Sequence, residues 1–160
     1  AYSCQTLYNK LMDKIISTLS FLAKTFEKNN ISWLLGASGA LMVHGVNIIP
    51  HDLDIFVSKD DVYKIADLLK DHLKNPVHNF TDKTGTFIEC QLWINEMEIE
   101  ICELGDISFD KLLLVDFNGT KIPVNPLENE LECYKNRPGK ENVVKLIEEK
   151  LLNKIKLSSA

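Results

Sequence analysis

The sequence predicts a mixed α/β fold of the α+β class, in which helices flank a mixed β-sheet and a short helical part follows. Its hydrophobic spacing alternates between helix and strand periods in the order α-β-α-β-α-β-β-β-β-β-α-α, which is typical of such folds. The composition, 45% hydrophobic and 26% charged, is that of a globular protein. A length of 160 residues favours one domain, with an N-terminal helix in 1–30, a sheet core in 31–125 and C-terminal helices in 126–160.

The first half of the chain alternates helices with strands. The expected elements are a helix over 7–26, a strand over 31–35, a helix over 37–44, a strand over 52–57 and a helix from 58 to about 73. Apolar residues spaced three and four apart define the first helix. Gly36 and Gly45 end the elements that precede them, and Ser58 is a suitable N-cap for the third helix.

The second half is rich in short strands. They are expected near 77–80, 86–94, 97–104, 112–117 and 120–124, and helices follow from 126 and over 141–155. Pro76 is expected to end the pattern of the preceding helix. The dipeptides Asn95-Glu96 and Asn118-Gly119 predict hairpin turns, and the second is the strongest such signal in the chain.

The net charge of −5 is unevenly distributed along the chain. The first 132 residues carry −9, whereas the segment from Cys133 to the end carries +4. Between Thr84 and Asp110 there is no lysine or arginine, but there are seven carboxylates. The acidic total argues against bulk nucleic-acid binding, although the basic end could still approach phosphate. No apolar run is long enough for a transmembrane helix, and four widely spaced cysteines favour reduced thiols in a cytoplasmic protein.

Asp52 and Asp54 form the most informative pair of residues in the sequence. Residues two apart in a strand project from the same face, so these carboxylates point together while Leu53 faces the core. At an effective dielectric of about 20, two carboxylates ~4 Å apart repel by roughly 4 kcal/mol. Only His51 beside them offers a cation, so the pair lies in water or binds a hard divalent metal such as Mg²⁺.

Two further features favour the metal. Gly36-Ala37-Ser38 opens a helix directly after a strand, where backbone N–H groups and the Ser38 hydroxyl could hold a phosphate. A later strand is also acidic, and its alternation places Glu96, Glu98 and Glu100 on one face.

Together these motifs resemble those of the nucleotidyltransferase superfamily with the DNA polymerase β-like fold. The similar segments are Leu35-Gly36-Ala37-Ser38, then Asp52-Leu53-Asp54-Ile55, then Ile99-Glu100-Ile101, with Met97-Glu98-Ile99 as a rival one step away. The resemblance covers roughly residues 31–150. The end of this region is similar to the helical part of small bacterial and archaeal members, which include antibiotic nucleotidyltransferases and abortive-infection toxins.

The resemblance implies a nucleotidyltransferase-type mixed sheet and a two-metal reaction. A nucleoside monophosphate would pass from an NTP such as ATP to a hydroxyl-type acceptor, with release of pyrophosphate. Asp52 and Asp54 would ligate both Mg²⁺ ions, for which Mn²⁺ could substitute. Glu100 would complete the acceptor-side metal and help to deprotonate the attacking group.

The resemblance also implies a phosphate site and leaves the partners open. Gly36 and Ser38 would hold the triphosphate, which Lys135, Arg137 or Lys140 would reach from the basic end of the chain. The acceptor could be a small molecule, an RNA end or a protein, and no membrane partner is expected. The oligomeric state is open, with a dimer as one possibility.

Some residues depart from the pattern of the superfamily. Ala37 stands where many relatives have a second glycine, and Ile48 stands where a basic residue is common. The missing base sustains a second hypothesis, a binding or regulatory module without efficient turnover, such as a toxin–antitoxin component.

Other titratable and aromatic residues have expected roles outside the reaction. His44 is expected to be partly buried or to cap its helix, and His78 to lie at the surface. Trp33 and Trp93 are expected in the core, and Glu89 on a solvated face.

Overall fold

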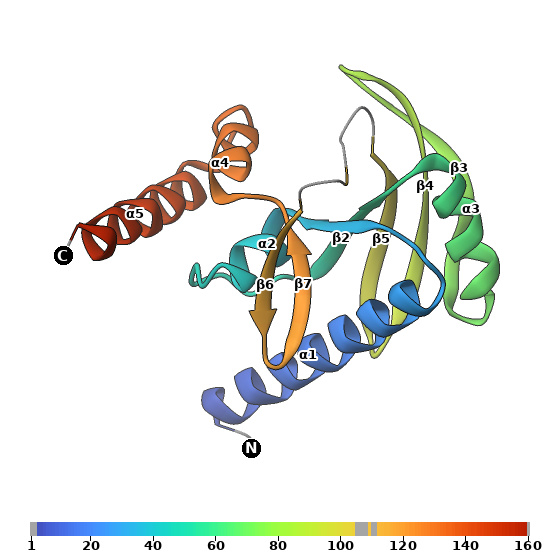
Figure 1. Ribbon diagram of the computed structural model, residues 1–160, viewed down its shortest axis with the longest axis horizontal. Helices are drawn as coiled ribbons and strands as arrows, with labels where there is room; N and C mark the ends of the chain where they lie inside the picture. The colour runs from blue at the N-terminus through green and yellow to red at the C-terminus, as the bar shows by residue number, and fades with distance from the viewer. Residues whose placement is uncertain (1–2, 105–108, 110–111, 160) are drawn as a thin grey trace.

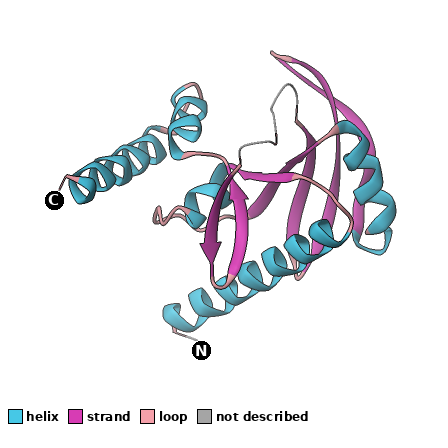
Figure 2. Ribbon diagram, in the orientation of Figure 1, coloured by secondary structure: helices cyan, strands magenta, loops and turns pink. Residues whose placement is uncertain are grey.

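The computed structural model describes residues 3–104, 109 and 112–159, in which seven strands form one mixed sheet flanked by helices (Figures 1 and 2). The strands are β1 (Trp33–Gly36), β2 (Asp52–Val57), β3 (Leu73–Asp82), β4 (Gly85–Ile94), β5 (Met97–Glu103), β6 (Leu113–Phe117) and β7 (Thr120–Val124). The helices are α1 (Cys4–Lys28), α2 (Ala37–Val43), α3 (Lys59–Leu68), α4 (Leu127–Lys135), α5 (Glu141–Ser158) and the 3₁₀ turn η1 (Lys70–His72). This order confirms the predicted fold class.

The sheet has the strand order β3-β4-β5-β2-β1-β7-β6 and contains both strand directions. β2 pairs in parallel with β5 and antiparallel with β1, and β1 pairs in parallel with β7. The remaining neighbours are antiparallel hairpins. The parallel pair brings the strand with both aspartates beside the acidic strand, although 39 residues separate Val57 from Met97 in the chain.

One face of the sheet is apolar and contributes to the main core. In β2, the alternate residues Leu53, Ile55 and Val57 are fully buried. They belong to one core with the buried residues of α1 and α3, where the ring of Phe26 meets that of Trp33 edge-on at 5.4 Å. Strand alternation therefore places both aspartates on the opposite face.

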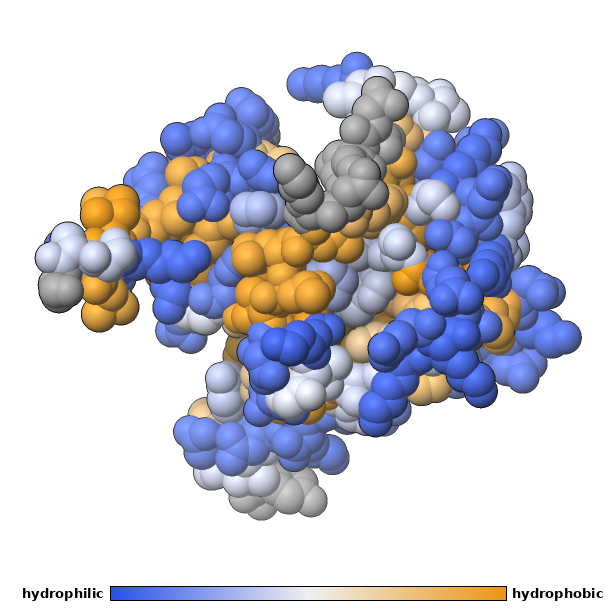
Figure 3. Space-filling model, viewed as in Figure 1, coloured by the Kyte–Doolittle hydropathy of each residue, from blue (hydrophilic) through white to orange (hydrophobic). Residues whose placement is uncertain are grey.

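A smaller apolar cluster joins the C-terminal helices to α2. Its buried members are Leu41, Val46, Leu127, Tyr134 and Ile147. Ile147 anchors α5, whose far end projects away from the sheet and exposes Leu152, Ile155 and Leu157 (Figure 1). Figure 3 shows apolar side chains at this end and a further group over β6 and β7. None of the helices described is both long and apolar enough to cross a membrane.

The third helix ends earlier than the sequence pattern predicts. α3 stops at Leu68, η1 follows, and β3 begins at Leu73 and contains Pro76. The expectation that the helix runs to about residue 73 is therefore wrong. Pro76 is tolerated within a strand because β3 is an edge strand, and its pairing with β4 shifts register on both sides of Asn75.

Both predicted hairpin turns are present. The backbone angle φ is +52° at Asn95 and +61° at Glu96, and it is +51° at Asn118 and +84° at Gly119. Positive φ at both central positions is the turn type that matches the twist of paired strands.

The expectation that both tryptophans lie in the core is correct for Trp33 alone. Trp93 is 48% exposed, and the Lys74 ammonium lies 5.4 Å from the centre of its ring. Trp93 pairs with Glu98 across β4 and β5, so it faces the acidic side of the sheet. Its exposure follows from that position, since the main core lies on the other side.

Candidate functional site

Four carboxylates from β2 and β5 share the face of the sheet opposite the main core. The parallel register sets Asp52 beside Glu98 and Asp54 beside Glu100. Because paired residues of neighbouring strands project to the same side, all four side chains meet above the sheet. The fold thus brings Asp52, Asp54 and Glu100 together, and it brings the rival Glu98 with them.

These carboxylates crowd one another. One oxygen each of Asp52, Glu98 and Glu100 lies within 4.8 Å of the others. The carboxyl group of Asp54 is hydrogen-bonded to that of Glu100. Burial raises the pKa of Asp54 well above its ordinary range, and this hydrogen bond and the charges of Asp52 and Glu100 act in the same direction. A bound cation would relieve the repulsion.

The ion pairs of the site leave most of this charge uncompensated. Lys74 Nζ lies 3.0 Å from Glu98 Oε1. In the described part of the chain, no lysine or arginine forms an ion pair with Asp52, Asp54 or Glu100. A set of carboxylate oxygens without a counter-ion is the donor set that Mg²⁺ and Mn²⁺ prefer, so these residues fit the implied metals.

Asp52 and Asp54 line a pocket of about 350 Å³ between the sheet and the C-terminal helices. The other lining residues are Ala37, Ser38, Ile48, Ile49, His51, Tyr134, Arg137, Lys140 and Val143. The aspartates therefore share one pocket with two cationic side chains. That distribution of charge fits a phosphate held next to a metal.

Two of the three basic residues considered from the sequence line this pocket. Arg137 and Lys140 do so, and the Arg137 guanidinium lies 5.0 Å from the centre of the Tyr134 ring. Its positive charge also opposes the rise in the pKa of Asp54. Lys135 is not part of the lining, and its Nζ lies 3.6 Å from Glu132 on the outer side of α4.

The turn between β1 and α2 forms a further part of the pocket. A Cβ at Gly36 would lie 2.6 Å from the ring of Phe56, so glycine is required there. Ala37 has φ +51°, a left-handed conformation that costs a residue other than glycine about 1–2 kcal/mol. Glycine adopts this conformation freely, so Ala37 is strained where a glycine would not be.

Solved structures with similar architecture decide the fold. A Thermotoga maritima protein described as a nucleotidyltransferase matches with a TM-score of 0.68 and 22% identity, over 87% of this chain and 92% of that one. The lincosamide antibiotic adenylyltransferase LnuA, solved with lincomycin bound, matches with a TM-score of 0.61 and 17% identity, over 81% of this chain and 94% of that one. This chain has the nucleotidyltransferase fold.

A third structure with the nucleotidyltransferase fold extends the comparison. It is an antigenic nucleotidyltransferase-like protein from Paracoccidioides brasiliensis, with a TM-score of 0.56 and 15% identity, over 91% of this chain and 77% of that one. No protein-family model matches the sequence, and no curated protein matches it significantly.

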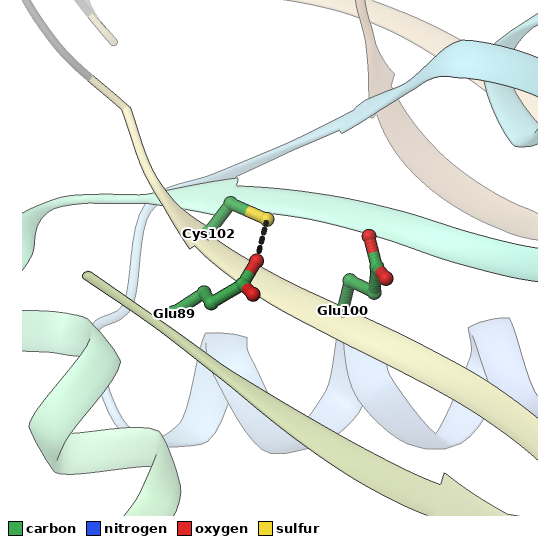
Figure 4. Close-up of side chains that lie close together, drawn as sticks. All are labelled: Glu89, Glu100 and Cys102. Carbon is green, nitrogen blue, oxygen red and sulfur yellow. Dashed lines mark hydrogen bonds between the residues drawn. The ribbon is translucent and has the colours of Figure 1, made fainter. Parts of the chain in front are cut away.

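In this nucleotidyltransferase fold, Glu89 on β4 belongs to a cluster of side chains that the sequence did not reveal. The carboxylate of Glu89 lies 2.9 Å from His78 Nε2 and accepts a hydrogen bond of 3.8 Å from Cys102 Sγ. Ligand atoms of Glu89, Glu100 and Cys102 all lie within 4.8 Å of one another (Figure 4). The expectation of a solvated face is therefore wrong for Glu89. Burial raises the pKa of the Cys102 thiol, which keeps the thiol protonated and neutral.

The junction of β7, α2 and α4 holds a second group that was missed. Asn125 Nδ2 donates to Glu130 Oε1 at 2.9 Å, and the Asn125 backbone N–H donates to Leu35 O at 2.9 Å. His44 Nε2 lies 2.8 Å from Asn125 O, which confirms a partly buried, structural His44. Helical phase could have identified Glu130, because it shares the buried side of α4 with Leu127 and Tyr134 at three- and four-residue spacing.

Proposed function

We propose that this protein transfers a nucleoside monophosphate from an NTP to a hydroxyl group of an acceptor and releases pyrophosphate, with Mg²⁺ as cofactor. The observation that carries the proposal is the register that sets Asp54 beside Glu100 and Asp52 beside Glu98, with both aspartates lining a pocket shared with Arg137. LnuA, which has the same fold, is an adenylyltransferase, and this supports ATP as the nucleotide.

In the proposed reaction, the acceptor oxygen bonds to the α-phosphorus of the NTP. The bond from that phosphorus to the oxygen bridging to the β-phosphate breaks, and its electron pair leaves with pyrophosphate. Glu100 accepts the proton of the acceptor hydroxyl. Asp52, Asp54 and Glu100 would hold two divalent cations, which would supply charge stabilisation for the entering and leaving oxygens.

Glu100 is proposed as the third ligand in preference to Glu98. Glu100 pairs with Asp54 and is hydrogen-bonded to it, whereas Glu98 is paired with Lys74 at 3.0 Å. The cation beside Glu98 already compensates its charge.

The triphosphate is proposed to lie along the turn after β1. Gly36 keeps the turn close to the sheet, and the Ser38 hydroxyl lines the pocket. Arg137 and Lys140 donate charge-assisted hydrogen bonds to phosphate oxygens from the helical side. Lys135, the third basic residue considered, is a weaker choice because it contacts Glu132.

A second candidate function is a binding or regulatory module that keeps the fold without efficient turnover. One observation favours it, because Ile48 places an apolar side chain in the pocket where a base is common among relatives. NTP binding and turnover separate the two candidates.

Calorimetry with ATP and Mg²⁺ tests the proposal. Wild-type protein is expected to bind ATP in the presence of Mg²⁺, and Asp52→Asn to bind it much more weakly. Asp67→Asn, which removes an exposed carboxylate on α3, is the matched control and should bind like wild type. Absence of wild-type binding at millimolar Mg²⁺ or Mn²⁺ overturns the proposed transferase.

A transfer screen then identifies the acceptor class. Labelled NTP is incubated with tRNA, candidate proteins and aminoglycoside-like compounds. Label on one of these classes supports the enzyme. ATP binding without any transfer or pyrophosphate release supports the module instead.

A further inference from the structure

Glu130 is the one buried charged side chain in the part of the chain that the structure describes. It is 4% exposed, lies on α4, and forms no ion pair with any described lysine or arginine. A buried carboxylate is costly unless hydrogen bonds compensate for its lost hydration. Its Oε1 accepts two of them, from the backbone N–H of Ala37 and from Asn125 Nδ2, each at 2.9 Å.

The first of these bonds reaches a strained residue. Ala37 has a left-handed backbone with φ +51° that alanine rarely adopts. A hydrogen bond to a charged acceptor is stronger than one between neutral groups, and its strength is of the same order as this strain. Glu130 therefore stabilises a conformation that the sequence at Ala37 disfavours.

The turn formed by Gly36, Ala37 and Ser38 lines two neighbouring cavities. Ala37 and Ser38 line the pocket that contains Asp52, while Ala37 and Glu130 line a smaller cavity of about 200 Å³ beside it. Glu130 is absent from the lining of the first pocket, so it contacts the turn from a different side. Its direct contact with the lining of that pocket is the hydrogen bond from the Ala37 backbone N–H.

Asn125, the second partner of Glu130, is itself held in place by β1 and by the C-terminal end of α2. Its backbone N–H donates to Leu35 O at the end of β1, and its own carbonyl lies 2.8 Å from His44 Nε2 at the end of α2. Small shifts of Glu130 are therefore resisted by the sheet and by α2 together.

We propose that Glu130 is a positioning residue, which holds the Gly36-Ala37-Ser38 turn in the conformation that binds the phosphates of the NTP. The inference rests on the proposed function, because it assigns the turn to the nucleotide. In this chain the Glu130 carboxylate on α4 stabilises the left-handed backbone at Ala37, which a glycine at position 37 would adopt without strain.

Calorimetry on Glu130→Gln tests the inference. This variant keeps the size of the side chain and removes its charge. The Kd for ATP with Mg²⁺ is expected to rise about tenfold, the lower end of the range for residues that orient a binding group. The Kd for Mn²⁺ alone should stay unchanged, since the carboxylates of the metal site are untouched. Glu128→Gln, on the exposed side of the same helix, is the matched control and should bind ATP like wild type.

A double variant separates positioning from a purely structural role. Because glycine needs no clamp at position 37, Glu130→Gln should cost little ATP affinity in an Ala37→Gly background. Loss of packing alone would lower the free energy of unfolding in both backgrounds equally and would give no such rescue. Glu130→Asp keeps the charge with a shorter reach, and an intermediate Kd is expected if the glutamine variant does not fold.

Hydrogen exchange distinguishes failure of this inference from failure of the proposed function. Exchange of the Ala37 amide, followed by NMR, is expected to be slow in wild type and faster in Glu130→Gln, with or without ATP. An unchanged exchange rate, or equal ATP affinity of wild type and Glu130→Gln, overturns the inference. Absence of ATP binding by wild type, with the exchange difference present, overturns the proposed function and with it the assignment of the turn to phosphate.

Discussion

At the scale of single residues, strand register decides which carboxylates meet. Leu53 pairs with Ile99 on the core side of β2 and β5, and both are fully buried. A shift of one residue would turn Glu98 and Glu100 into the apolar core, so the hydrophobic pattern fixes the register. The same pattern places both Glu98 and Glu100 beside the aspartates, and only the residues that each glutamate contacts distinguish the two.

Because Glu100 and Glu98 contact different residues, substitution of each is expected to have a different effect on activity. Glu100→Gln removes a carboxylate that lies beside Asp54, and it should lower the rate of pyrophosphate release from ATP by about 100-fold, which corresponds to a loss of about 2.7 kcal/mol of charge stabilisation. Glu98→Gln removes one member of an ion pair with the partly exposed Lys74, and it should lower the same rate by about twofold. Steady-state pyrophosphate release measures both.

ATP binding supplies the control for this pair of variants. Both should keep wild-type affinity for ATP to within about threefold, since the third carboxylate is proposed to act on the acceptor side. Equal activity of wild type and Glu100→Gln, with a large loss in Glu98→Gln, would move the third ligand to Glu98.

The residues that sequence reasoning missed are those whose role depends on a distant neighbour. Asp52 and Asp54 could be predicted because strand alternation alone makes them point together. Glu89 could not, because its partners His78 and Cys102 come from the strands on either side of β4. Trp93 was assigned to the core from its apolar strand, whereas alternation along β4 places it on the same face as Glu89 and Gln91.

At the scale of elements, local signals predicted most boundaries and failed where tertiary structure intervened. The two hairpins followed from their turn residues, and β2 has the predicted bounds. α3 ended early because Leu73 joins an edge strand, and Pro76 is compatible with that strand only through a local register shift. No periodicity within residues 58–80 contains that information.

His44, where α2 meets β7, makes the free energy of unfolding depend on pH. Burial lowers the pKa of His44, although its hydrogen bond with the Asn125 carbonyl acts in the opposite direction. The folded protein therefore keeps His44 neutral at pH values where the unfolded chain binds a proton. The contribution of His44 to the free energy of unfolding should consequently fall as pH drops below the ordinary histidine value of 6.5, whereas the raised pKa of Asp54 contributes in the opposite direction.

Urea unfolding at several pH values checks this dependence. His44→Gln removes this titrating group, so its free energy of unfolding should increase relative to that of wild type as the pH falls from 7 to 5. The control is His72→Gln, which changes an exposed histidine and should retain the wild-type slope. Equal slopes for His44→Gln and wild type would show that His44 does not contribute.

At the scale of the whole molecule, the net charge of −5 separates into two regions that the fold brings together. The first 132 residues carry −9, and four of their carboxylates gather on one face of the sheet. The segment from Cys133 carries +4, and two of its cations line the same pocket as Asp52 and Asp54. The sheet thus contributes negative charge to this pocket and the C-terminal helices contribute positive charge, a separation that the net charge alone conceals.

Concentrated negative charge should make the stability of the whole molecule depend on divalent cations. Mg²⁺ at about 100 times its Kd should raise the free energy of unfolding by about 2.7 kcal/mol, because it binds the folded state alone. For a chain of this size, each kcal/mol corresponds to about 2–4 °C in Tm, so a thermal shift measured at constant ionic strength detects the effect.

Without metal, Asp52→Asn should melt above wild type, because one repelling charge near Asp54 is gone. With Mg²⁺ it should gain less than wild type, whereas Asp67→Asn should gain the full shift, since it leaves the site intact. An Mg²⁺ shift of equal size in Asp52→Asn would place the bound cation elsewhere on the molecule.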